Sequence, residues 1–115
     1  MEIVRKKIGR SRLIQDYTRT FATVVKAVVD VRRGLMALDA ELHADLEALL
    51  IDDGSEPEDL WGINLYPFQK RDNFIEYVAL INIRPSLGNY SMEIDDETLR
   101  KRIAEIVWDL IDYET

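Results

Sequence analysis

The stretch VVKAVVDVRRGLMALD, residues 24–39, decides the fold expected for this chain. Its valine-rich alternation with a period of two predicts a β-strand over residues 24–32. Arg33-Gly34 then predicts a tight turn, and residues 35–39 a second strand that returns beside the first. One face of the first strand is apolar and the other polar: Val25, Ala27, Val29 and Val31 against Lys26, Asp30 and Arg32. Such a hairpin implies an antiparallel or mixed sheet.

Three helices are expected around this hairpin. The first begins at Ser11, which can cap it, and runs to about Phe21. The second covers residues 41–53, with Asp39 as N-cap and Gly54 just beyond its end. The third is capped by Asp95 or Asp96 and ends near Asp112. Their apolar stripes are Leu13, Tyr17 and Phe21; Leu42, Leu46, Leu49 and Leu50; and Leu99, Ile103, Ile106, Val107 and Leu110.

Three further strands complete the expected fold, over residues 2–7, 60–66 and 74–84. Both faces of the 74–84 segment carry apolar residues, which predicts a central strand. Gly62 interrupts the 60–66 strand and indicates a bulge or a close backbone contact. The sequence thus predicts a single α+β domain over residues 1–115, with the order β-α-β-β-α-β-β-α. About five mostly antiparallel strands would pack with three helices.

The composition narrows the class of function. The chain has 115 residues, 47% of them hydrophobic, and no cysteine, which excludes disulfide scaffolds and thiolate chemistry. Its net charge of −7 is uneven, because residues 1–35 hold nine Lys/Arg and three Asp/Glu (+6) and residues 36–115 hold six and nineteen (−13). The acidic body argues against nucleic-acid or anionic-membrane binding as the main role. No signal peptide or membrane span is predicted, so we expect a cytoplasmic protein.

The only histidine suggests a first candidate site. His43 and Glu47 are four residues apart on the predicted second helix, and Glu41 and Asp45 lie nearby. Carboxylates beside an imidazole can orient it as a metal ligand or a general base, so His43, Asp45 and Glu47 are the candidate catalytic residues of a small metal-assisted hydrolase. The alternative is a polar helix face opposite the leucine stripe. No motif indicates a cofactor or a complete metal ligand set.

A second candidate site lies after the 74–84 segment, at Asn82, Arg84, Ser86 and Asn89. An arginine with backbone N–H groups near a helix N-terminus can bind a phosphate or carboxylate. Acidic residues at the start of the last helix would repel such an anion. Alternatively, Arg84 pairs with an internal acid such as Glu76. A composite active site would require His43 and Arg84 to face one pocket.

Two surface features suggest partners. Trp61, Tyr66 and Phe68 could anchor a protein interface, or could belong to the core. A cluster of cations near the N-terminus could contact nucleic acid, or could protect an exposed edge strand. That cluster consists of Arg5, Lys6, Lys7, Arg10 and Arg12.

Three blocks carry a resemblance to a known family: MALDAELHADLEALLIDDGS (36–55), DLWGINLYP (59–67) and INIRPSLGNYSMEIDDETLR (81–100). They resemble the signature blocks of a family of small prokaryotic proteins catalogued only as a domain of unknown function. The resemblance covers residues 24–112 and implies a stand-alone prokaryotic domain without an assigned activity. Tyr90 stands where the family has an arginine in a GNRS segment, which weakens a basic anion site there.

These observations favour a non-enzymatic binding or regulatory module, with self-association as a homodimer or another protein as partner. The small size, the acidic surface and the absence of a catalytic motif all support this hypothesis. The metal-assisted hydrolase and a nucleic-acid-binding role for the basic N-terminal third remain as alternatives.

Overall fold

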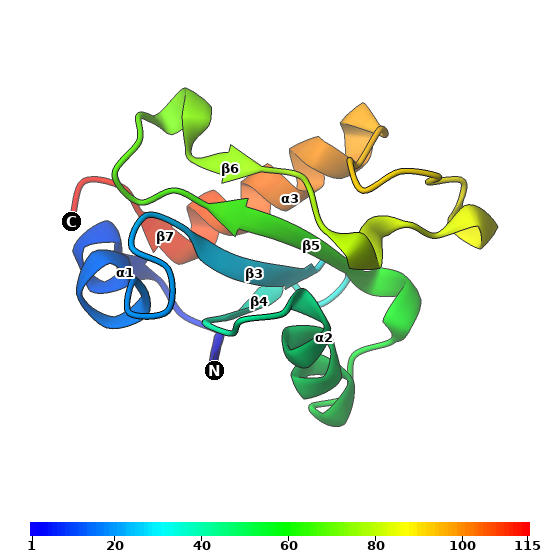
Figure 1. Cartoon of the computed structure of the whole chain (residues 1–115), viewed down its shortest axis with the longest axis horizontal. Coiled ribbons are helices and arrows are strands. Elements are labelled where there is room, and N and C mark those ends of the chain that lie inside the picture. Colours follow the sequence, from blue (N-terminus) through cyan, green and yellow to red (C-terminus); the bar gives the residue numbers. More distant parts are fainter.

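The computed structural model describes all 115 residues and shows an α+β fold built on a five-stranded antiparallel sheet (Figure 1). The strands lie in the order β1-β4-β3-β5-β6, so the predicted hairpin forms the middle of the sheet. A separate parallel pair, β2 with β7, joins the two ends of the chain. The strands are β1 (Glu2–Val4), β2 (Ile8–Gly9), β3 (Val25–Asp30), β4 (Leu35–Leu38), β5 (Leu60–Leu65), β6 (Ile75–Glu76) and β7 (Ile111–Asp112).

The helices cover both faces of the sheet, as Figure 1 shows for α2 and α3. On one side α2 packs Leu46 and Leu50 onto Val28 of β3 and Ala37 of β4. On the other side α1 and α3 cover the larger core around the opposite face of β3. The helices are α1 (Arg10–Tyr17), α2 (His43–Asp52) and α3 (Glu97–Leu110), with short 3₁₀ turns η1 (Pro57–Asp59), η2 (Arg71–Asn73), η3 (Leu80–Asn82) and η4 (Pro85–Leu87).

The β3–β4 hairpin confirms the prediction from residues 24–39. Val29 pairs with Met36 and Asp30 with Leu35, and Gly34 adopts a φ of 69° in the turn. Such a positive φ is strained for residues with a Cβ, which explains the glycine. Asp30 departs from the expected polar outer face, because its side chain is fully buried.

The helix boundaries follow the sequence in part. The α3 prediction is confirmed, and Asp96 accepts hydrogen bonds from the N–H groups of Thr98 and Leu99. The N-cap predicted for α2 is wrong, since Asp39 directly follows β4 with a φ of 75°, the helix begins at His43 and its N-cap residue is Leu42. Leu42 therefore precedes the helix and is 58% exposed instead of buried. Helix α1 ends at Tyr17, four residues before Phe21.

The largest correction concerns residues 74–84, predicted as a central strand. Only Ile75 and Glu76 form β6, which is an edge strand of the sheet. The chain then turns through η3 and pairs with its own continuation, through bridges between Val78 and Glu93 and between Arg84 and Asn89. The apolar residues on both faces of this segment suggested a central strand, but two of them, Leu80 and Ile83, are exposed to solvent. The first strand is likewise shorter than predicted and stops at Val4.

Gly62 confirms the predicted close contact. A Cβ added at Gly62 would lie 2.5 Å from the Cβ of Ala79, so only glycine lets the segment after β6 lie against β5.

None of the helices has the length and apolar character that crossing a bilayer requires.

Candidate binding surface

The residues of the predicted catalytic site do not converge. His43 lies at the start of α2, where its Nε2 is 2.9 Å from the carbonyl oxygen of Ile63 on β5. Because a carbonyl only accepts, Nε2 carries the proton and donates it. Glu47 instead binds Arg84, and Asp45 is exposed to solvent. No group of three or more His, Asp or Glu side chains is arranged to hold a metal ion.

Burial favours the neutral form of the His43 imidazole. Burial lowers the pKa of His43, the hydrogen bond with the Ile63 carbonyl opposes this shift, and the charge of Lys26 adds to it. The side chain of Asn64 favours the protonated ring more weakly. One ring nitrogen of His43 is already hydrogen-bonded within the protein, so the half-buried imidazole lines the surface of a groove and is not a free general base.

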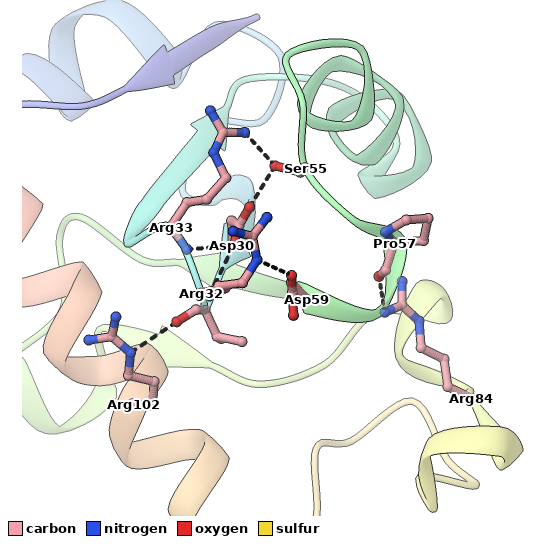
Figure 2. Close-up of polar contacts among 9 residues, drawn as sticks. Asp30, Arg32, Arg33, Ser55, Pro57, Asp59, Arg84 and Arg102 are labelled. Carbon is pink, nitrogen blue, oxygen red and sulfur yellow. Dashed lines mark hydrogen bonds and ion pairs between the residues drawn. The ribbon is translucent and has the colours of Figure 1, made fainter.

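Arg84 is fully engaged within the protein. Its Nη2 lies 2.5 Å from Glu47, its Nε donates to Ile81 O and its Nη1 to Pro57 O, the last visible in Figure 2. The guanidinium also lies over the ring of Trp61, 5.3 Å from the centroid. Only 14% of the Arg84 side chain is exposed, so its hydrogen bonds stabilise the fold and few of its N–H groups are free to bind an external anion. The internal acid is Glu47 and not Glu76, which corrects the expected pairing. Arg84 and His43 line separate hollows.

Asn82 and Asn89, also predicted as ligand-binding, are internal braces. Asn82 accepts from Gly62 N–H at 2.8 Å and donates to Gly62 O and Met92 O. Asn89 donates to the carbonyl of Asn82 and to two further carbonyls, and accepts from the N–H of Asp95. Both side chains are buried. Ser86 alone of the predicted ligand-binding set lies exposed, at the tip of this segment.

The predicted interface residues separate into three environments. Trp61 is 5% exposed and belongs to the core, as the alternative expectation held. Tyr66 is partly buried and donates to Glu76 at 3.0 Å. Phe68 is 57% exposed in the loop before β6. Only Phe68 thus offers a large free apolar surface.

The N-terminal cations follow edge strand β1, and most are already engaged. Arg5 pairs with Asp53, and Arg12 with Glu2 and Asp16. Arg10 lies over the ring of Tyr113, at 4.1 Å from its centroid. Their position beside β1 matches the expectation of a charge-protected sheet edge.

A buried polar network at the β3–β4 turn was not foreseen from the sequence (Figure 2). Asp30 accepts from the N–H groups of Arg32 and Arg33 and from the hydroxyl of Ser55, at 2.6–2.9 Å. Arg33 also donates to Ser55 and Asp53, and Arg32 to Asp59. The network ties the hairpin to the end of α2 and to η1, so it is a structural brace.

A second unforeseen feature is the apolar outer surface of residues 80–92. Five of the nine exposed large hydrophobic residues of the chain fall in these thirteen positions. Figure 1 shows the segment projecting from one end of the sheet between β6 and α3. The five are Leu80 (71% exposed), Ile83, Leu87, Tyr90 and Met92. Individual exposed apolar residues are ordinary, but five within thirteen positions make this segment a candidate interaction surface.

Two of these residues border a groove of about 440 Å³ between this segment and the start of α2. Leu80 and Met92 lie on one side and Leu42 on the other, and seven of its ten lining residues are hydrophobic. His43, Asn64 and Lys26 supply the polar part. We call Leu42, Leu80, Met92 and this groove the apolar docking face.

The chain is thus a small α+β domain in which residues 80–92 are held by internal hydrogen bonds and expose apolar side chains. Comparison with known families agrees with the resemblance seen in the sequence blocks. The chain belongs to the family described as Protein of unknown function (DUF5674), which matches residues 2–110. No curated protein and no solved structure matched the chain.

Proposed function

We propose that this chain is a non-enzymatic protein-binding module whose partner docks on the apolar docking face. The observation that carries the proposal is the contrast between the inside and the outside of residues 80–92. On the inner side, the polar groups form hydrogen bonds within the protein, from the side chains of Asn82, Arg84 and Asn89. Outside, the same segment presents large apolar side chains, of which Leu80 is 71% exposed.

The internal bracing favours binding, because a surface that is already ordered loses little conformational entropy when a partner arrives. Residues 80–92 contain only two short 3₁₀ turns. The side chains of Asn82 and Asn89 therefore supply many of the hydrogen bonds to backbone groups that strand pairing would otherwise make. Exposed apolar residues on a rigid support are typical of interface anchors. Leu80 and Met92 are the anchors we infer.

The hydrolase hypothesis receives less support from the same geometry. It needs His43 and a carboxylate in one site, and Glu47 is committed to Arg84. The charge of the chain also favours a different protein over a second copy, since two bodies of net charge −7 repel one another.

Site-specific photo-crosslinking in cells that express the protein natively tests the proposal. A benzophenone amino acid replaces Leu80 in one variant and Ile51, an exposed apolar residue of α2 that does not line the groove, in the control. We expect a discrete adduct from position 80 and none of that mass from position 51. A mass of two chains would indicate self-association instead, and equal labelling from both positions would contradict the docking face.

A further inference from the structure

A second hollow adjoins the apolar docking face and differs from it in chemistry. It measures about 550 Å³ and shares Val78 with the apolar groove, so the two hollows meet at that residue. Three carboxylates line it: Asp72, Glu76 and Glu93. We call this hollow the acidic hollow. The groove on one side of this shared residue is mostly apolar, with Lys26 donating to the carbonyl of Glu41, and the acidic hollow carries the three carboxylates.

The carboxylates of the acidic hollow are only partly neutralised. Glu76 accepts hydrogen bonds from Asn64 and Tyr66, both neutral groups. The single cation of the hollow is Arg100, which lies 3.9 Å from Glu93. The side chain of Glu93 is nevertheless 65% exposed. With three carboxylates and one guanidinium among its lining residues, the hollow keeps a formal net charge of −2.

Arg100 is held in place by contacts within the protein. Its Nε donates to the carbonyl of Ile94 at 2.5 Å, and its guanidinium lies 4.8 Å from the ring centroid of Tyr77. The second aromatic residue of the hollow, Tyr66, lies beside Glu76. Carboxylates next to an aromatic ring suit a Lys or Arg side chain, which gains both an ion pair and a cation–π contact.

Charge complementarity therefore identifies the occupant. We propose that the segment docking on this surface is basic: an apolar side chain enters the groove beside Leu80 and Met92, and a neighbouring Lys or Arg lies in the acidic hollow. This inference rests on the proposed function and adds the chemistry of the partner. An acidic partner would meet like charge there, which costs affinity and slows association.

Fluorescence anisotropy with three labelled octapeptides tests this inference on the full chain. The peptides alternate leucine with lysine, leucine with glutamate, and serine with lysine. We expect the leucine–lysine peptide to bind at least about tenfold more tightly than either of the others, a difference of about 1.4 kcal/mol. Its affinity should also fall as salt is raised, because the exposed charges are screened.

Two sets of variants locate the binding. The triple change Asp72→Asn, Glu76→Gln and Glu93→Gln should weaken the leucine–lysine peptide about tenfold. Its matched control removes the same number of charges elsewhere, on exposed positions of α2 and α3: Asp52→Asn, Glu105→Gln and Asp109→Asn. The control should leave the affinity unchanged. Leu80→Asp should abolish binding.

The outcomes separate the inference from the function on which it rests. If the leucine–glutamate peptide binds as tightly and still depends on Leu80, apolar docking stands and the basic partner is wrong. If the serine–lysine peptide matches the leucine–lysine peptide, or the control triple variant weakens it equally, general charge attraction explains the result and the inference fails. If no peptide responds to Leu80→Asp, both the inference and the docking face are contradicted.

Discussion

Asn82 binds both peptide groups of Gly62: its Oδ1 accepts from the Gly62 N–H at 2.8 Å and its Nδ2 donates to the Gly62 carbonyl at 2.9 Å. One side chain thus stands in for a neighbouring strand at the point where β6 has ended. The same amide also donates to Met92 O, so it joins β5 to the segment that carries the apolar docking face.

Replacing Asn82 with alanine should destabilise the fold by about 3 kcal/mol, because buried N–H and C=O groups of Gly62 lose their partners. Urea denaturation followed by circular dichroism measures the change. Ser86→Ala, at the exposed tip of the same segment, is the control and should change stability by less than about 0.5 kcal/mol. A loss below about 1 kcal/mol for Asn82→Ala would show that the segment does not depend on this brace.

Gly62→Ala should cost about 1–3 kcal/mol, since the new methyl group would lie 2.5 Å from the Cβ of Ala79. The double variant Gly62→Ala with Ala79→Gly removes the opposing Cβ and should recover part of this loss. A double-mutant cycle by urea denaturation measures the coupling. Strict additivity of the two changes would contradict the close contact.

Asp30→Ala should also destabilise the protein by about 3 kcal/mol. The change leaves two backbone N–H groups and the Ser55 hydroxyl without their acceptor in a buried site. Asp52→Ala, on the exposed end of α2, is the matched control and should have little effect. Thermal unfolding distinguishes them, and equal melting temperatures for the two variants would rule out the network as a brace.

His43 should give the protein a pH-dependent stability. Burial lowers the pKa of His43 in the folded state below its ordinary value of 6.5, so the unfolded chain binds the proton more readily. The free energy of unfolding is therefore highest above the unfolded-state pKa of about 6.5, where His43 is neutral in both states. It decreases as the pH falls from about 6.5 toward the lower pKa of the folded state, because protonation then favours the unfolded chain. Because His43 is the only histidine, an NMR titration reports it without overlap. A midpoint above 6.5 would contradict the burial.

The fold could be predicted from the sequence wherever burial follows a simple period. The hairpin of β3 and β4 alternates every two residues, and α3 repeats its apolar stripe with a capping aspartate. Residues 74–84 alternate as well, yet Leu80 and Ile83 face solvent. These apolar residues lie on the surface, and a periodic pattern alone does not distinguish exposed apolar residues from buried ones.

The candidate site could be predicted only as a region. In the block INIRPSLGNYS the polar side chains of Asn82, Arg84 and Asn89 are internal, whereas the apolar side chains of Ile83, Leu87 and Tyr90 are exposed. That inversion depends on long-range contacts, such as Asn82 with Gly62 and Arg84 with Glu47, 20 and 37 residues apart. The one local signal was Gly62, whose predicted close contact was found.

The apolar docking face is tested most directly by Leu80→Asp, measured for folding and for binding in the same preparation. Leu80 is 71% exposed, so its replacement should change the urea midpoint little, as is usual for surface positions. The complex with the partner recovered by crosslinking, reconstituted from purified proteins, should be lost. A complex that forms with undiminished affinity would contradict the account.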